Sequence, residues 1–163
     1  MATEKEKFIH VWEREFQTTL KVLKAYPPDK LDLKPAEKSK SARDLLMVFA
    51  NEQHFFSMGL DGNIDFMAPM PKAPSSLEAI VGVTEKGNEQ LVAKLKSMAE
   101  SDFGVTFPWM VAPKTMGKIS KQEFSWLMLM DSIHHRGQLS VYIRLAGGKV
   151  PSIYGPTADE PWM

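Results

Sequence analysis

Apolar residues recur every three to four positions in two long segments of the chain, residues 4–26 and residues 76–101. This spacing places them on one face of an α-helix. Two further segments, residues 42–59 and 121–146, are apolar over more of their surface, which is typical of helices packed on several sides. No run alternates apolar and polar residues long enough to predict a convincing strand, although residues 103–111 are compatible with a short hairpin. The pattern therefore predicts an all-α fold, a four-helix bundle with long connections.

The predicted helix starts share a local signal, a hydroxyl residue followed three positions later by a carboxylate. In such a capping box, each side chain pairs with a backbone N–H that the helix leaves free. The four pairs are Thr3 with Glu6, Ser41 with Asp44, Ser75 with Glu78, and Ser120 with Glu123. The tail, residues 149–163, contains three prolines and a glycine and is not expected to form a fifth helix. We expect it to fold back across the bundle, with Tyr154 and Trp162 as anchors.

The composition narrows the class of protein. The 163 residues fit one domain spanning the whole chain, and 20 basic residues balance 20 acidic ones. Neutrality removes the attraction on which sequence-independent nucleic-acid binding relies, so no nucleic-acid partner is expected. No apolar run approaches the ~20 residues that span a bilayer, and residues 1–8 do not resemble a secretory signal. We therefore expect a cytoplasmic protein without a membrane partner. The absence of cysteine excludes disulfides and thiolate ligands.

The last predicted helix carries a polar stripe on the broad face that would point into the bundle. Asp131 and His135 lie one turn apart, so both side chains can reach the same metal ion. Gln138 and Tyr142 continue the stripe, and His134 lies at its edge. A structural hydrogen bond between Asp131 and His135 is the commoner explanation of this spacing. A metal site therefore needs another ligand from a different helix.

The segment 42–59 offers two candidates for that ligand. His54, the better one, shares a helical face with Met47, Ala50 and Met58. Glu52 lies on a different face, with Leu45, Phe49 and Phe56. Because this helix is apolar nearly all round, periodicity does not decide which face turns inward. Glu52 thus competes with His54 as a ligand, with a surface or supporting position as the alternative. His10 is expected at the surface.

Residues 134–160, HHRGQLSVYIRLAGGKVPSIYGPTADE, closely resemble the end of DinB-like proteins, a family of metal-binding four-helix bundles. Residues 41–56 extend the resemblance more weakly. It implies a divalent metal, commonly zinc or nickel, held by one histidine of the second helix and two histidines four residues apart on the last. In this chain the corresponding ligands are His54, Asp131 and His135, with an aspartate where the family has a histidine. Such a set also suits iron or manganese. His134, Gln138, Tyr142 and Glu52 are then candidates to support the ligands or to line the pocket.

Proteins similar to this family include thiol S-transferases, such as bacillithiol transferases and a mycothiol-dependent isomerase. The resemblance implies a metal-dependent enzyme of stress response or detoxification, either transferring a low-molecular-weight thiol or hydrolysing a small molecule; it assigns no catalytic residue. Two alternatives stay open: a non-catalytic dimeric metal- or ligand-binding protein, and an iron oxygenase with two histidines and one carboxylate. Three lysines near the start of the last helix are candidates to attract an anionic thiol: Lys114, Lys118 and Lys121.

The last helix also has an apolar face roughly opposite its polar stripe, formed by Trp126, Leu129, Met130, Ile133 and Val141. No helix of a four-helix bundle is central, so a second apolar face predicts contact with another subunit. We therefore expect a homodimer. The alternative is that the loops 60–75 or 103–117 cover this face.

Overall fold

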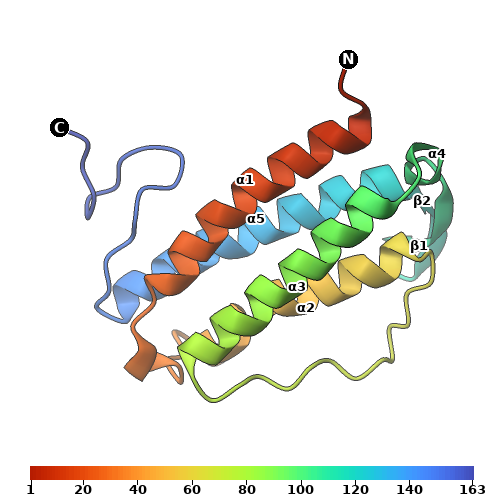
Figure 1. Ribbon diagram of the computed structural model, residues 1–163. Coiled ribbons are helices and arrows are strands. Elements are labelled where there is room, and N and C mark those ends of the chain that lie inside the picture. The colour runs from red at the N-terminus through yellow and green to blue at the C-terminus, as the bar shows by residue number, and fades with distance from the viewer.

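The computed structural model describes residues 1–163 and shows four long helices with a β-hairpin at one end (Figure 1). The long helices are α1 (Glu4–Lys24), α2 (Ala42–Leu60), α3 (Leu77–Ser97) and α5 (Lys121–Leu145). The short elements are a 3₁₀ turn (Pro28–Lys30), α4 (Glu100–Phe103), β1 (Thr106–Ala112) and β2 (Thr115–Ser120). The prediction of an all-α four-helix bundle is confirmed. A hairpin does lie before the last helix, but it extends beyond the expected residues 103–111, which contribute to strand β1 only. No helix combines the length and the hydropathy that crossing a bilayer requires.

Three of the four predicted helix caps are present at the predicted residue. Thr3 and Ser120 form complete capping boxes with Glu6 and Glu123, and Ser41 accepts a hydrogen bond from the backbone of Asp44. The prediction for the third helix was wrong by one position. Its cap is Ser76, whose hydroxyl accepts from the backbone N–H of Ala79, so Ser75 and Glu78 form no capping box.

The third helix also ends before the predicted residue 101. Met98 takes an extended conformation, with ψ at 137°, and the chain turns into the separate short helix α4. The buried ammonium group of Lys5, on α1, donates to the carbonyl of Met98. This contact from another helix satisfies a carbonyl at the point where α3 stops, which no local stop residue marks.

A crossover connection determines which helices are neighbours. Residues 61–76 run along the length of the bundle, so α2 and α3 point the same way while α5 runs antiparallel to α2 (Figure 1). Helix α2 packs against α3 and α5, and α1 packs against the same two helices from the other side. The antiparallel pair α2 and α5 carries all the residues of the candidate site described below.

A buried ion pair between α1 and α5 also binds the C-terminal tail. Arg136, on α5, is 1% exposed and donates to the Glu15 carboxylate of α1 at 2.7 Å and to the Thr19 hydroxyl at 3.2 Å. The Tyr154 hydroxyl of the tail donates to the same Glu15 carboxylate at 2.6 Å. Trp162, by contrast, donates to Ser152 within the tail. Tyr154 is therefore the tail aromatic that contacts the helices through hydrogen bonds.

Candidate metal centre

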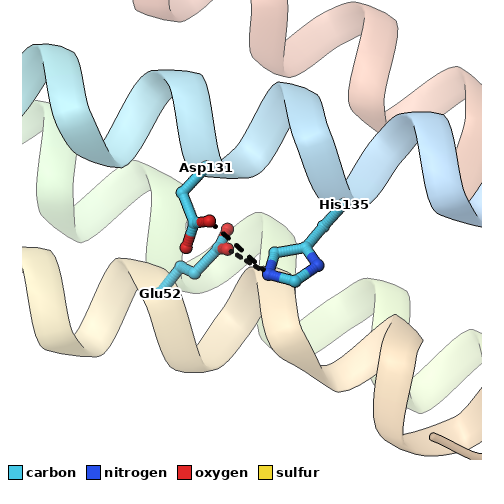
Figure 2. Close-up of side chains that lie close together, drawn as sticks. All are labelled: Glu52, Asp131 and His135. Carbon is cyan, nitrogen blue, oxygen red and sulfur yellow. Dashed lines mark ion pairs between the residues drawn. The ribbon is translucent and has the colours of Figure 1, made fainter. Parts of the chain in front are cut away.

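Three ionisable side chains from α2 and α5 point toward one another between the two helices (Figure 2). His135 Nε2 lies 3.5 Å from an oxygen of Glu52 and 3.7 Å from an oxygen of Asp131. One ligand atom from each residue lies within 4.8 Å of the other two. Separations of roughly 3–4 Å are those expected between ligand atoms that each lie ~2.1 Å from one ion. The three residues, here called the Glu52 cluster, are thus close enough to bind one cation.

Helical geometry explains how the sequence brings these groups together. Asp131 and His135 are four residues apart on α5 and therefore lie on the same face. On α2, Glu52 shares its face with three side chains that the core buries almost completely: Leu45, Phe49 and Phe56. Burial of these large apolar side chains, worth about 1.5–3 kcal/mol each, turns that face inward and takes the carboxylate with it.

The environment of Glu52 fits a bound cation. Its side chain is only 10% exposed, and neither carboxylate oxygen has a hydrogen-bond partner in good geometry, although Asp131 and Ser132 lie close enough to influence its pKa. Burial, reinforced by the negative charge of Asp131, raises the pKa of Glu52 to about 9. A buried carboxylate without a partner is costly, and a cation beside it removes that cost. Two carboxylates and one imidazole nitrogen are also a donor set that divalent metals accept.

Gln138 controls the orientation of His135. The amide oxygen of Gln138 accepts a hydrogen bond from His135 Nδ1 at 3.0 Å, while the amide nitrogen donates to His134 Nε2 at 2.9 Å. With its proton on Nδ1, a neutral His135 ring has Nε2 free to bind a cation lying between Glu52 and Asp131. This tautomer is the one that a metal ligand needs.

His54 is not part of the Glu52 cluster. It lies two residues after Glu52, which is about 200° around the helix, and its side chain is exposed. The structure therefore corrects the expected grouping: Asp131 and His135 lie together as the spacing predicted, but Glu52 occupies the place expected for His54. The other predicted residues, His134, Gln138 and Tyr142, lie on α5 outside the cluster. His134 and Gln138 are exposed. The half-buried Tyr142 donates its hydroxyl hydrogen to the Lys40 carbonyl at 3.0 Å.

A cleft of about 490 Å³ opens beside the Glu52 cluster and is bounded by α2, α5 and the hairpin. All three cluster residues line it. Its remaining lining includes Lys40 and Asn51, together with the apolar residues Val48, Phe55, Met70, Trp109, Leu127 and Met128. A second cavity of about 450 Å³ adjoins it and shares Lys40 and His135. The lysines singled out from the sequence, Lys114, Lys118 and Lys121, line neither cavity. Lys40 could not be singled out from the sequence, because it precedes a helix and no motif surrounds it.

The fold and the Glu52 cluster define a four-helix-bundle protein with a candidate metal centre between two antiparallel helices. Comparison with models of protein families places the chain in a particular family. The DinB family model matches residues 1–162, and the chain therefore belongs to the DinB family. A comparison with functionally curated proteins finds no significant match.

Solved structures agree with this assignment at the level of the fold. A DinB-like protein from Bacillus cereus ATCC 10987 superposes with a TM-score of 0.77 at 20% sequence identity, over 90% of this chain and 95% of that one. A DinB-like protein from Bacillus subtilis gives a TM-score of 0.72 at 20% identity, over 96% of this chain and 99% of that one. At this identity the likeness establishes the shared architecture alone.

Proposed function

We propose that the Glu52 cluster binds a divalent metal ion and that the protein is a metal-dependent enzyme acting on a small molecule in the adjoining cleft. The observation that carries the proposal is the buried Glu52 carboxylate, which faces Asp131 and His135 without any hydrogen-bond partner. With three protein ligands, a metal retains a position for water or substrate, as catalytic metals do and closed structural sites do not.

The donor set bears on the choice of metal and on the chemistry. One imidazole and two carboxylates suit zinc, nickel, iron and manganese, and the second carboxylate favours the harder ions relative to a three-histidine site. Such an ion lowers the pKa of a bound water or thiol toward neutrality. Transfer of a low-molecular-weight thiol to an electrophile, or hydrolysis of a small molecule, would follow from that chemistry. A two-histidine, one-carboxylate iron triad loses its support, because the cluster contains only one histidine.

The residues of the site would position the metal and the substrate and would not themselves form bonds to the substrate. Gln138 holds the His135 ring with Nε2 toward the carboxylates, and burial beneath α5 shields Glu52 from water. Asp131 is 45% exposed and stands where the cluster meets the cleft. A substrate in the cleft therefore approaches from the Asp131 side.

A second candidate function is a non-catalytic metal- or ligand-binding protein with a stress-related role. The observation that favours it is the lining of the cleft. Apart from the Glu52 cluster, the only ionisable side chain there is Lys40, so no separate carboxylate or histidine serves as a general base.

Metal analysis tests the proposal. Untagged protein incubated separately with zinc, nickel, iron and manganese is dialysed and its metal measured by mass spectrometry. We expect about one ion per chain in the wild type, and loss of most of it in both Glu52→Gln and His135→Ala. His54→Ala is the matched control, because His54 lies on the same helix but is exposed and should leave the metal content unchanged.

The outcomes separate the alternatives. Metal retained in Glu52→Gln, or lost in His54→Ala, would contradict the Glu52 cluster as the binding site. If the site holds, the metal-loaded protein is assayed for thiol-dependent loss of an electrophile and for ester hydrolysis. Turnover lost in His135→Ala supports the enzyme. Stoichiometric metal without turnover in either assay supports the binding protein.

A further inference from the structure

The cleft beside the Glu52 cluster differs in chemistry from one end to the other. At one end lies the segment before α2, with Lys40 and, in the adjoining cavity, Lys38. The Glu52 cluster occupies the middle. At the other end, α2 and the hairpin contribute Phe55 and Trp109. Helices α2 and α5 run antiparallel (Figure 1). His135, the later of the two α5 residues, therefore lies toward the start of α2, and Leu127 lies toward its end.

The basic end carries two lysines that have no ion-pair partner. Lys38 and Lys40 are both exposed and neither forms an ion pair or donates a side-chain hydrogen bond, whereas several other lysines pair with carboxylates. The Tyr142 hydroxyl of α5 donates to the Lys40 carbonyl and holds this backbone beside His135. The backbone of Lys40 is therefore held close to His135, and Lys40 lines both cavities.

The other end is an aromatic wall. The Trp109 ring lies 5.9 Å from Phe55, 6.0 Å from Phe66 and 5.0 Å from Phe124, measured between ring centroids. Phe66, in the crossover connection, remains half exposed beside it. Aromatic faces that are only partly covered favour stacking with a flat apolar group.

From this arrangement we propose that the cleft binds a small amphipathic anion, with its anionic group at Lys40 and Lys38 and its apolar, preferably aromatic, group against Trp109 and Phe55. The two ends are separated by at least the span from His135 to Leu127. Eight residues at ~1.5 Å each make this about 12 Å, the length of a two-ring molecule. The inference rests on the proposed function in two respects: a bound metal offsets the carboxylates of the Glu52 cluster, and it places the ligand's reacting group beside them. The apolar preference stands without it.

The test uses two fluorescent probes of the same shape. One is 8-anilinonaphthalene-1-sulfonate, an amphipathic anion; the other is N-phenyl-1-naphthylamine, which lacks the sulfonate. Each is titrated into the metal-loaded full chain. We expect one anionic probe per chain, and a Kd raised about fivefold by Lys40→Gln and about tenfold or more by Lys40→Glu, as loss and reversal of one partly screened charge pair predict. The Kd of the neutral probe should stay the same in both variants.

Two further variants complete the design. Trp109→Ala should weaken both probes, because it removes the apolar wall rather than the charge. Lys118→Gln, on β2 and outside both cavities, is the charge-matched control and should change neither. Equal affinity for the two probes in the wild type, an equal effect of Lys118→Gln and Lys40→Gln, or no binding of either probe would overturn the inference. Metal content measured on the same samples distinguishes this failure from failure of the metal site.

Discussion

At the scale of single residues, the carboxylate of Glu52 is the group whose environment departs most from that of an ordinary side chain. It is buried, lacks a hydrogen-bond partner and faces a second carboxylate, Asp131. Without a cation, burial and the charge of Asp131 raise the pKa of Glu52 to about 9, so the carboxyl group keeps its proton at neutral pH. With a divalent ion it ionises and becomes a ligand. The same residue therefore makes both the stability of the metal-free protein and its metal affinity depend on pH.

The first consequence is a pH dependence of stability in the metal-free protein. The folded chain holds the Glu52 proton up to about pH 9, while the unfolded chain releases it near its ordinary value of 4.5. The folded state thus binds more protons in this window, and its stability falls as pH rises. Between about pH 5 and pH 8 the loss from this residue is up to about 4 kcal/mol.

Urea unfolding of metal-free protein across this window measures the effect. Glu52→Gln, which keeps the shape but cannot ionise, should flatten the decline. The wild type should become more stable on adding a metal that it binds, and more so at pH 8 than at pH 6, because binding displaces a proton. A wild-type profile no steeper than that of Glu52→Gln would show that the carboxyl group has an ordinary pKa.

Two of the three residues of the Glu52 cluster were predictable from residue spacing alone. Asp131 and His135 are neighbours on any helix, so their pairing needs no tertiary information. The choice between His54 and Glu52 does need it, because the two residues lie on different faces of a helix that is apolar nearly all round. The large side chains on the Glu52 face, such as Phe49 and Phe56, indicated that this face turns inward. The His54 face carries the apolar residues Met47 and Ala50, so only packing against α5 decides between the two faces.

At the scale of elements, helix starts were more predictable than helix ends. A capping residue and its partner are adjacent in sequence, which is why Thr3, Ser41 and Ser120 cap the expected helices. The end of α3 depends instead on Met98 meeting Lys5 from α1, 93 residues away in sequence. Tertiary contacts of this kind leave no local pattern.

The close approach of α2 and α5 gives a prediction at this scale. A Cβ added at Gly59 would lie 2.1 Å from the ring of Phe124, which is fully buried. Gly59 also lies seven residues after Glu52 on the same face of α2, so it sets the helix separation at the site. We expect Gly59→Ala to lower the free energy of unfolding by about 1–3 kcal/mol through overpacking.

Gly82→Ala provides the matched control. Gly82 lies within α3, and a Cβ there would meet nothing within 4 Å. Alanine favours helix over glycine, so this variant should be more stable than the wild type by about 0.5–1 kcal/mol. Thermal and chemical unfolding of the two variants compare them directly. A Gly59→Ala protein as stable as the wild type would mean that Phe124 moves aside without cost.

At the scale of the whole molecule, the crossover and the hairpin assemble the cleft from distant parts of the sequence. Lys40 precedes α2, Met70 lies in the crossover, and Trp109 lies on β1. None of these residues stands in a motif, which is why sequence reasoning selected lysines that lie elsewhere. The bundle and its long connections were predictable from the apolar pattern, but the contents of the cleft follow from where the loops run.

The outer face of α5 bears on assembly. The apolar face expected there is narrower than the sequence indicated, because the Trp126 ring packs 5.2 Å from Phe8 of α1 and Leu129 is buried. Of the expected residues, Met130 and Val141 remain well exposed, and Leu145, which was not expected on this face, extends them into a row of three apolar side chains, each 55–59% exposed. Gly137 interrupts the row and has open space where a side chain would stand. Positions 130, 137, 141 and 145 share one helical face.

We propose that two copies of the chain pair along this row, since exposed apolar side chains on one helix gain most from a second apolar surface and a central glycine permits close approach. Light scattering at micromolar concentration should then give about twice the chain mass of 18.4 kDa. The double variant Met130→Lys, Leu145→Lys should shift the protein to the monomer without changing its helical content. Val83→Lys, at a 42% exposed position on α3, should leave the mass unchanged. A monomeric wild type would show that this row is an ordinary solvent-facing surface, and a dimer that survives the double variant would place the interface elsewhere.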